Sequence, residues 1–182
     1  LIGVKKMSIR FDDRVAIVTG AGGGIGKQHA LELAKRGAKV VVNDLGGGVD
    51  GSGASDAAEE VVDQIKSNGG EAISNGASVT DLEAVKEMVE KTMSEWGRID
   101  ILVNNAGILR DKSFHKVTID DFNLVMDVHF QGTLNCTHSV FPIMREQEYG
   151  RIIFTSSSSG VFGNFGQTNY GSAKMAMIGL MN

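Results

Sequence analysis

Three consecutive glycines separate a short apolar run from a helix-like segment, and this junction constrains the fold more than any other feature. The apolar run covers residues 15–19, and apolar residues recur after the glycines at helical spacing until Gly37. Glycines at such a junction let the backbone approach a phosphate, whose charge the free N–H groups of the helix start stabilise. A flexible loop is the alternative, but the position between a strand and a helix favours nucleotide binding. The expected contacts come from Gly20, Gly22, Gly24, Ile25 and Gly26.

The same alternation of short apolar runs and amphipathic helices continues along the chain. Further buried strands are predicted at residues 39–43, 71–74, 100–103 and 151–155, with helices between them. Strands that alternate with helices pair in parallel through right-handed crossovers. The pattern therefore predicts an α/β fold, a Rossmann-like, doubly wound parallel sheet with helices on both faces, in a single domain over residues 1–182.

Residue types also predict where several helices begin and end. Thr80 and Glu83 have the spacing of a capping box, which predicts a helix start there, and Gly97 ends that helix. A long helical region covers residues 119–148, in which Pro142 is expected to produce a kink or an interruption. A last helix begins near Tyr170.

The two ends of the chain carry expectations of their own. Residues 1–10 lack the apolar core of a signal peptide and are expected to form a flexible N-terminal extension. The last helix contains apolar residues, Met175, Ile178 and Met181 among them, with no later segment to cover them. We therefore expect the domain to be C-terminally incomplete here, with its last strands beyond Asn182.

The overall composition argues against several classes of partner. A net charge of -4 provides no basic field for nucleic acid, and no run approaches the roughly 20 apolar residues of a membrane span. Cys136 is the one cysteine, so an internal disulfide cannot form, which fits a reducing compartment. No metal site is predicted. The expected location is cytoplasmic, with the peroxisome as the alternative in a eukaryote.

Asp44, at the end of the second predicted strand, bears on the choice of nucleotide. A carboxylate there accepts hydrogen bonds from the hydroxyls of an adenosine ribose and repels a 2′-phosphate. No arginine follows it, and Gly23 stands where a basic residue could hold that phosphate. The cofactor is therefore expected to be NAD rather than NADP, the alternative being that Asp44 only caps its strand.

Polar residues also follow the fourth and fifth predicted strands. Residues 104–107 and 155–159 come directly after those strands, and ligands bind at the carboxyl edge of such sheets. Taken alone, the first segment is typical of a turn and the second of a loop, and spacing does not single out one hydroxyl.

Tyr170 and Lys174 are one helical turn apart, so both side chains can face one site. A free phenol has a pKa of about 10 and keeps its proton at neutral pH. A neighbouring ammonium stabilises the phenolate, which makes the pair a usable general acid/base. The spacing alone is common, so the pair gains weight only with the other motifs.

Together these segments resemble the short-chain dehydrogenase/reductase family from Arg14 onward. The cofactor turn at 19–26, the Asn-Asn-Ala-Gly segment at 104–107 and the Tyr170/Lys174 pair occur in the family's order. The resemblance implies an NAD-dependent oxidoreductase acting on CH–OH groups. It also implies Ser157 as the catalytic serine, with Ser158 as runner-up, and further cofactor contacts from Ser78, Val79, Asn105, Ala106 and Gly107.

The chain is similar in particular to one branch, the (3R)-hydroxyacyl-CoA dehydrogenase domains of peroxisomal multifunctional enzymes. The similarity lies in residues 41–47, 104–112 and 149–170. It implies oxidation of a (3R)-hydroxyacyl-CoA to a 3-ketoacyl-CoA in fatty-acid β-oxidation, and a homodimer or homotetramer. The alternatives are a 3-oxoacyl-carrier-protein reductase, a hydroxysteroid dehydrogenase and, from another class, a non-catalytic nucleotide-binding remnant.

Two further expectations follow from this resemblance. His129 occupies the position of an asparagine that in much of the family connects the lysine to solvent; it is a candidate proton shuttle, or simply a packed residue. Arg110, Lys112 and Lys116 follow the fourth strand, where they could meet the phosphates of coenzyme A or lie in a solvated loop.

Overall fold

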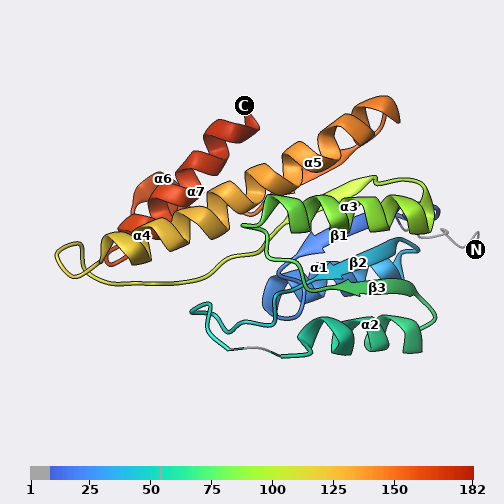
Figure 1. Ribbon diagram of the computed structural model, residues 1–182, viewed down its shortest axis with the longest axis horizontal. Coiled ribbons are helices and arrows are strands. Elements are labelled where there is room, and N and C mark those ends of the chain that lie inside the picture. Colours follow the sequence, from blue (N-terminus) through green and yellow to red (C-terminus); the bar gives the residue numbers. More distant parts are fainter. Residues whose placement is uncertain (1–8, 54) are drawn as a thin grey trace, which may run out of the picture.

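The protein, described here from a computed structural model covering residues 9–53 and 55–182, is built on one parallel β-sheet (Figure 1). Its five strands are β1 (Val15–Thr19), β2 (Lys39–Asn43), β3 (Glu71–Asn75), β4 (Ile101–Asn104) and β5 (Arg151–Phe154). They lie in the order β3-β2-β1-β4-β5, with every neighbouring pair parallel. The order reverses direction at β1, next to β4. The predicted doubly wound α/β fold is confirmed, and all five strands lie where the sequence placed them.

Helices cover both faces of this sheet because alternate strand residues point to opposite sides. Helices α1 (Gly24–Lys35) and α2 (Ala57–Ser67) cover the lower face in Figure 1, where they bury Val18 and Val42. Helices α3 (Leu82–Trp96) and α5 (Gly132–Glu146) cover the upper face, where they bury Ile17 and Val41. Within the described residues, no helix is long and apolar enough to cross a membrane.

The long helical region has a different internal structure from the one predicted. It consists of α4 (Ile119–Met126), a π-helical turn η1 (Asp127–Gln131) and α5. Helix α5 continues through Pro142, so the predicted interruption there is wrong, and the break in regular α-helix lies at η1. Both Pro142 and His138, the residue whose carbonyl loses its partner, are exposed, so water can replace the missing bond.

The predicted capping box at the start of α3 is also wrong. The N-cap residue is Asp81, whose carboxylate accepts hydrogen bonds from the backbone N–H groups of Glu83 and Ala84. Thr80 bonds the Ser78 hydroxyl instead. A carboxylate next to the first turn is a better acceptor for these N–H groups than the hydroxyl one residue earlier.

Two helices complete the described part of the chain. Helix α6 (Ser158–Phe162), which the sequence did not predict, packs against α7 (Thr168–Met181). Of the expected N-terminal extension, residues 1–8 lie outside the described residues. The carbonyl of Ile9 accepts a hydrogen bond from Arg36, and Arg10 forms an ion pair with Asp12, so these two residues are held to the rest of the protein.

Asp100 ties the amino-terminal edge of the sheet together. Its carboxylate is fully buried and accepts hydrogen bonds from Arg14, Arg98 and the backbone N–H of Val15, at 2.6–3.0 Å. Its own backbone connects to β1 and to β5. The Arg14 guanidinium lies 3.7 Å from the centre of the Tyr149 ring. The sequence reasoning placed Asp100 at a strand start and missed this role.

Candidate active site

The glycine turn after β1 has the shape and charge that a diphosphate requires. A side chain at Gly26 would collide with the backbone of Gly20, so only glycine allows α1 to start this close to β1. Gly23, the N-cap of α1, provides no side-chain cap, and the first turn of α1 contains no acidic residue. Exposed Gly23, Gly24 and Ile25 border open space. The predicted turn therefore presents an uncapped helix start, which suits an anion.

Asp44 lies beside this turn, as predicted. One carboxylate oxygen accepts from the Gly22 N–H at 2.8 Å and the other accepts from the Gly46 N–H at 2.8 Å. Each oxygen keeps a second lone pair for a ribose hydroxyl. Asp44 thus fastens the loops after β1 and β2 to each other in addition to carrying the negative charge expected beside the ribose.

Thr19 and Asn105 join the loop after β4 to the loop after β1. The Thr19 hydroxyl accepts from the N–H groups of Asn105 and Ala106, and the Asn105 amide donates to the carbonyls of Thr19 and Gly20, all at 3.0 Å. The Asn105 side chain therefore holds the two loops together, and its contact with a ligand would come from its backbone. Thr19 was predicted as part of the cofactor turn, but its role in joining the two loops was not predicted, although its place at the end of β1 was the available signal.

Ser78 and Val79, the expected adenine contacts, lie in the connection from β3 to α3. The Val79 carbonyl accepts from the Asn135 amide at 2.9 Å, and its side chain is 7% exposed. Ser78 is half-buried and shares a 2.8 Å hydrogen bond with Thr80. Asn135, on α5, was not predicted and holds this segment in place.

Tyr170 and Lys174 lie on the first two turns of α7, as predicted. Lys174 is 3% exposed, and its Nζ donates to the Thr155 carbonyl at 2.5 Å. That nitrogen lies 5.5 Å from the centre of the Tyr170 ring. Burial lowers the pKa of Lys174 to about 8. A cation held by one backbone bond beside a phenol is the arrangement that general acid/base catalysis by tyrosine needs.

Ser157 is the N-cap residue of α6, next to this pair. Its Oγ accepts from the Ser159 N–H at 3.2 Å, which leaves its own hydrogen available to a substrate oxygen. Ser156 bonds the Lys174 carbonyl, so the serine segment is attached directly to α7. Ser158 is exposed. The local geometry favours Ser157 over Ser158, the choice that the family resemblance also implies.

Asn169 connects the loop after β4 to the start of α7 and was missed by the sequence reasoning. It is 1% exposed; its amide donates to the Arg110 carbonyl at 3.1 Å and its oxygen accepts from the Tyr170 N–H at 2.8 Å. A buried polar residue directly before Tyr170 was the signal that could have found it.

The three basic residues proposed for coenzyme A phosphates are mostly occupied. Asp121 lies 3.7 Å from Arg110 and 2.7 Å from Lys112, so one carboxylate neutralises part of the charge of both. Lys116 has no ion pair among the described residues. The charge of this loop therefore adds little support for phosphate binding.

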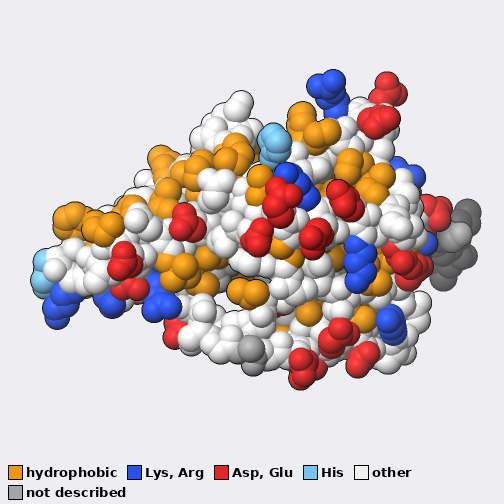
Figure 2. Space-filling model, viewed as in Figure 1, with side chains coloured by type: hydrophobic (Ala, Val, Ile, Leu, Met, Phe, Trp, Pro, Cys, Tyr) orange, Lys and Arg blue, Asp and Glu red, His pale blue; other side chains and the backbone are white. Residues whose placement is uncertain are grey.

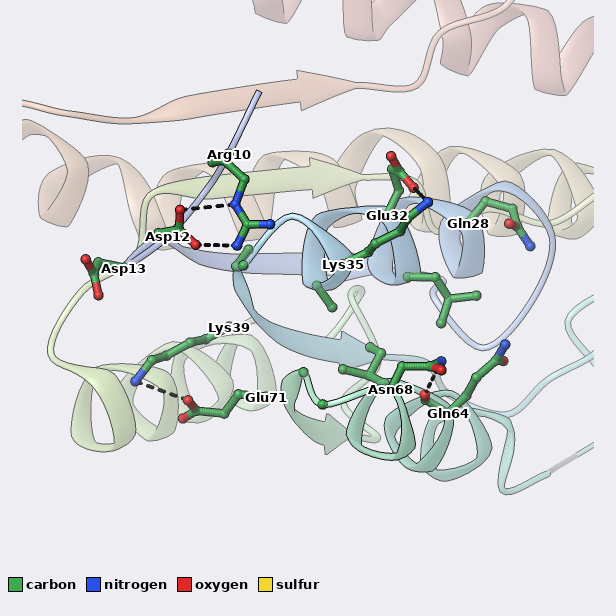
Figure 3. A pocket seen from close by; sticks show the side chains of 17 residues that line it. Arg10, Asp12, Asp13, Gln28, Glu32, Lys35, Lys39, Gln64, Asn68 and Glu71 are labelled. Carbon is green, nitrogen blue, oxygen red and sulfur yellow. Dashed lines mark hydrogen bonds and ion pairs between the residues drawn. The ribbon is translucent and has the colours of Figure 1, made fainter. Parts of the chain in front are cut away.

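A cavity of another kind lies at the amino-terminal edge of β1, β2 and β3 (Figure 3). It has a volume of about 700 Å³ and lies between the ends of α1 and α2. Most of its charged side chains pair with one another, as Figure 3 shows for Arg10–Asp12, Glu32–Lys35 and Lys39–Glu71. None of the residues predicted for catalysis or cofactor binding lines it. We therefore place the active site at the carboxyl edge.

Comparisons with known proteins identify the family of the chain. The chain is 57% identical over 96% of its length to peroxisomal multifunctional enzyme type 2 of Drosophila melanogaster, of which it spans 29%. It is 44% identical over 91% of its length to a 3-oxoacyl-[acyl-carrier-protein] reductase of Synechocystis, of which it spans 64%. A 7α-hydroxysteroid dehydrogenase crystallised with NADH and a 7-oxo bile acid superposes on 94% of the chain, with a TM-score of 0.85 and 34% identity, and the chain covers 64% of it.

The short chain dehydrogenase family model matches residues 14–182. The chain therefore belongs to the short-chain dehydrogenase family, whose members are oxidoreductases acting on CH–OH groups.

Proposed function

We propose that this chain oxidises a (3R)-hydroxyacyl-CoA to the 3-ketoacyl-CoA with NAD, as part of fatty-acid β-oxidation. The observation that carries the proposal is the 57% identity to a peroxisomal multifunctional enzyme, together with an intact set of a serine at the N-cap of α6 and a tyrosine and a lysine on α7. A second relative is named for reducing a 3-oxoacyl thioester, the same functional group in the opposite direction. The chain spans only part of each relative, so the activity is proposed for the protein that contains it.

The residues of the site would divide the work of alcohol oxidation as follows. Tyr170, as phenolate, accepts the hydroxyl proton of the substrate. Ser157 donates its free hydrogen to the same oxygen and holds the carbinol in place. NAD, when bound, would supply the acceptor for the hydride that leaves the carbinol carbon. Lys174 stabilises the phenolate and would donate to a ribose hydroxyl of the bound cofactor, and Tyr170 passes its proton to water after the ketone has formed.

The buried cation of Lys174 is expected to make the stability of the protein depend on pH. Its pKa in the folded chain, about 8, lies below its ordinary value of 10.5. Between these values the unfolded chain binds the proton that the folded chain has released, so the free energy of unfolding rises as pH rises from about 8 to about 10.5. Urea unfolding across this range should show a steeper rise for the wild type than for Lys174→Met, with exposed Lys35→Met as control. Equal slopes in all three proteins would contradict the buried charge.

The cofactor fits the site, and Asp44 is expected to select NAD over NADP. We expect the wild type to bind NAD at least tenfold more tightly, and Asp44→Asn to reduce that ratio by roughly tenfold, about 1.4 kcal/mol. Asparagine keeps the size of the side chain and one oxygen, and removes the charge that repels a 2′-phosphate. Fluorescence titration with both dinucleotides measures the ratio.

Two further variants separate charge from structure in this test. Asp44→Ala leaves the N–H groups of Gly22 and Gly46 without their acceptor, so it should weaken binding of both dinucleotides. Asp50→Asn removes an exposed charge from the same loop and should leave the ratio unchanged. Equal wild-type affinities for NAD and NADP would refute the assignment.

The substrate is tested by offering the full-length protein a matched panel with NAD. The panel contains (3R)- and (3S)-hydroxyacyl-CoA, a hydroxyacyl carrier-protein thioester and a 17β-hydroxysteroid. A fixed nicotinamide face and a fixed Tyr170 accept one hand of the carbinol, so we expect turnover of the (3R) thioester at least tenfold above that of the (3S) form. Preference for the steroid or the (3S) thioester would overturn the substrate while leaving the dehydrogenase intact.

The relatives bear on location as well. Several of them are named as peroxisomal enzymes, from Drosophila melanogaster, Dictyostelium discoideum and Saccharomyces cerevisiae. These names favour the peroxisome over the cytoplasm for this chain.

We expect the protein to associate through α5 and α7. Figure 2 shows hydrophobic side chains gathered over the upper left of the molecule, where Figure 1 places α4 and α7. Phe141, Met175 and Met181 are 54%, 49% and 59% exposed, and apolar surface of this kind is commonly covered by a partner. Phe130, Leu134 and Ile178 would add apolar contact to this interface and are half-buried.

Sedimentation of the full-length protein should show a dimer or a tetramer. Met175→Glu places a charge in the proposed contact and should raise the dissociation constant at least tenfold. Ile9→Glu, on a residue that is 68% exposed at another edge, should not. A monomer at micromolar concentration, or equal association of both variants, would contradict the interface.

A further inference from the structure

His129 is buried between the loop after β4 and helix α7, which both contribute to the candidate active site. It is 3% exposed and lies in the π-helical turn η1 between α4 and α5. π-helical turns cost regular hydrogen bonding and occur frequently at functional sites. Here the turn occurs at the residue whose ring points toward the loop after β4.

The ring is hydrogen-bonded to the backbone of Ile108, three residues after Asn105. Its Nε2 lies 3.1 Å from the Ile108 nitrogen and 2.8 Å from the Ile108 oxygen. Whichever tautomer is present, this nitrogen bonds the same residue, because it accepts from the N–H or donates to the carbonyl. The loop also approaches the ring closely at Gly107, where any side chain would collide with the imidazole. The histidine therefore determines how near this loop lies to α4 and η1.

The same ring contacts Tyr170. The two ring centres are 5.2 Å apart and the planes are at 89°, an edge-to-face contact. Ile108 is 8% exposed and packs in a small apolar cluster with Val125 and Ala173, against which Tyr170 also packs. One side chain thus touches both the loop that follows the Asn-Asn-Ala-Gly segment and the phenol that exchanges the proton.

The surroundings of His129 favour the neutral ring. The ring could offer a proton to the Ile108 carbonyl, but Nδ1 has no hydrogen-bond partner among the described residues, so an imidazolium would lack a second acceptor. Burial, and then the charge of Lys174, lower the pKa of His129 to about 4. A group that stays neutral at physiological pH is poorly suited to carry a proton between Lys174 and solvent.

We propose that His129 is a positioning residue: by bonding the Ile108 backbone and packing its ring against Tyr170, it sets the placement of the phenol relative to the loop after β4. The inference rests on the proposed dehydrogenase function, since it assigns Tyr170 the proton transfer. It differs from a proton shuttle, because the histidine acts through its shape and one hydrogen bond. A misplacement of about 1 Å at such a site lowers turnover by as much as about 10²-fold.

The test compares His129→Gln and His129→Phe in the full-length protein. The Gln amide reaches the same place as Nε2 and can still bond Ile108, whereas Phe keeps the ring contact with Tyr170 and loses the bond. Neither can carry a proton. We expect turnover to fall about 10- to 100-fold in His129→Phe and less than fivefold in His129→Gln, with the shape of the pH profile unchanged in both. Tyr170→Phe is the inactive reference.

Hydrogen exchange without cofactor provides a readout independent of activity. The backbone N–H groups of residues 105–112 should exchange at least tenfold faster in His129→Phe than in the wild type, and near the wild-type rate in His129→Gln. Circular dichroism of each variant checks that the domain has folded.

The outcomes separate the two roles. Equal losses of turnover in both variants, restored by added imidazole, would show a shuttle and overturn the proposal. Wild-type turnover and exchange in His129→Phe would also overturn it. If the wild type and Tyr170→Phe have the same rate, the proposed function fails, while the exchange result still decides whether His129 holds the loop.

Discussion

Tyr170→Phe is expected to lower turnover of a secondary alcohol by about 10²–10⁴-fold, the range typical of a general acid/base. Phenylalanine keeps the ring that packs against His129 and removes the oxygen that accepts the proton. The backbone N–H of residue 170 still donates to Asn169, so the start of α7 should remain in place. Initial rates of NADH formation with a fixed, saturating alcohol measure the loss.

The matched control is Tyr149→Phe, which removes the phenol oxygen from the only other tyrosine of the chain. Tyr149 lies at the opposite edge of the sheet, where its ring stacks under Arg14 and Arg151, and phenylalanine retains that stacking. The turnover of Tyr149→Phe should stay within about twofold of that of the wild type. Binding of NAD should survive in both variants. Near-normal turnover of Tyr170→Phe would show that another group accepts the proton.

The strands and the glycine turn could be predicted because their signals are local. A buried parallel strand is a continuous apolar run, and 39–43 and 101–104 are such runs, bounded by residues that end strands. The turn before α1 was predicted because its glycines lie between an apolar run and a helix-like segment, and this arrangement can be read from the sequence. Tyr170 and Lys174 were found because one helical turn separates them and the other motifs accompany them in the sequence.

Features that depend on tertiary contacts could not be predicted in this way. The π-helical turn at 127–131 lies in a region with ordinary helical periodicity, and its placement depends on the contact of His129 with Ile108 across the core. The short helix α6 depends on packing against α7. The basic loop after β4 looked available for phosphates because the sequence does not reveal that Asp121 folds back onto it.

The predicted start of α3 was wrong because two neighbouring residues could each act as its N-cap. Thr80 and Asp81 are both good N-caps, and a one-residue shift decides which oxygen faces the free N–H groups of α3. Pro142 carried a strong signal for an interruption, but an exposed position lets water satisfy the lost bond. The site was therefore predictable as a set of residues, while the contacts that hold these residues in place required the structure.

Asp100 lies far along the sheet from this site, and its loss is expected to have the largest effect on stability. Asp100→Ala leaves Arg14, Arg98 and the Val15 N–H without their shared acceptor and should lower the free energy of unfolding by about 3–5 kcal/mol. Asp100→Asn keeps one oxygen and should cost less, about 1–3 kcal/mol, since both arginines are partly exposed and can reach water. Urea unfolding at neutral pH measures all three proteins.

The acid limb of the stability curve provides a second test of the same carboxylate. Burial alone would raise the pKa of Asp100, but the hydrogen bonds from Arg98, Val15 and Arg14 outweigh it and hold the pKa below its ordinary value. A carboxyl with a depressed folded pKa stabilises the fold above about pH 4, and this contribution is lost as pH falls through the folded value. The wild type should therefore lose stability more steeply below pH 4 than Asp100→Asn does.

Asp12→Asn is the matched control, because Asp12 forms an arginine pair of the same 2.7 Å length on the exposed surface and should change stability by less than about 0.5 kcal/mol. If Asp100→Ala costs no more than Asp12→Asn, burial of the carboxylate contributes nothing, and the amino-terminal edge of the sheet must be held by its apolar contacts alone.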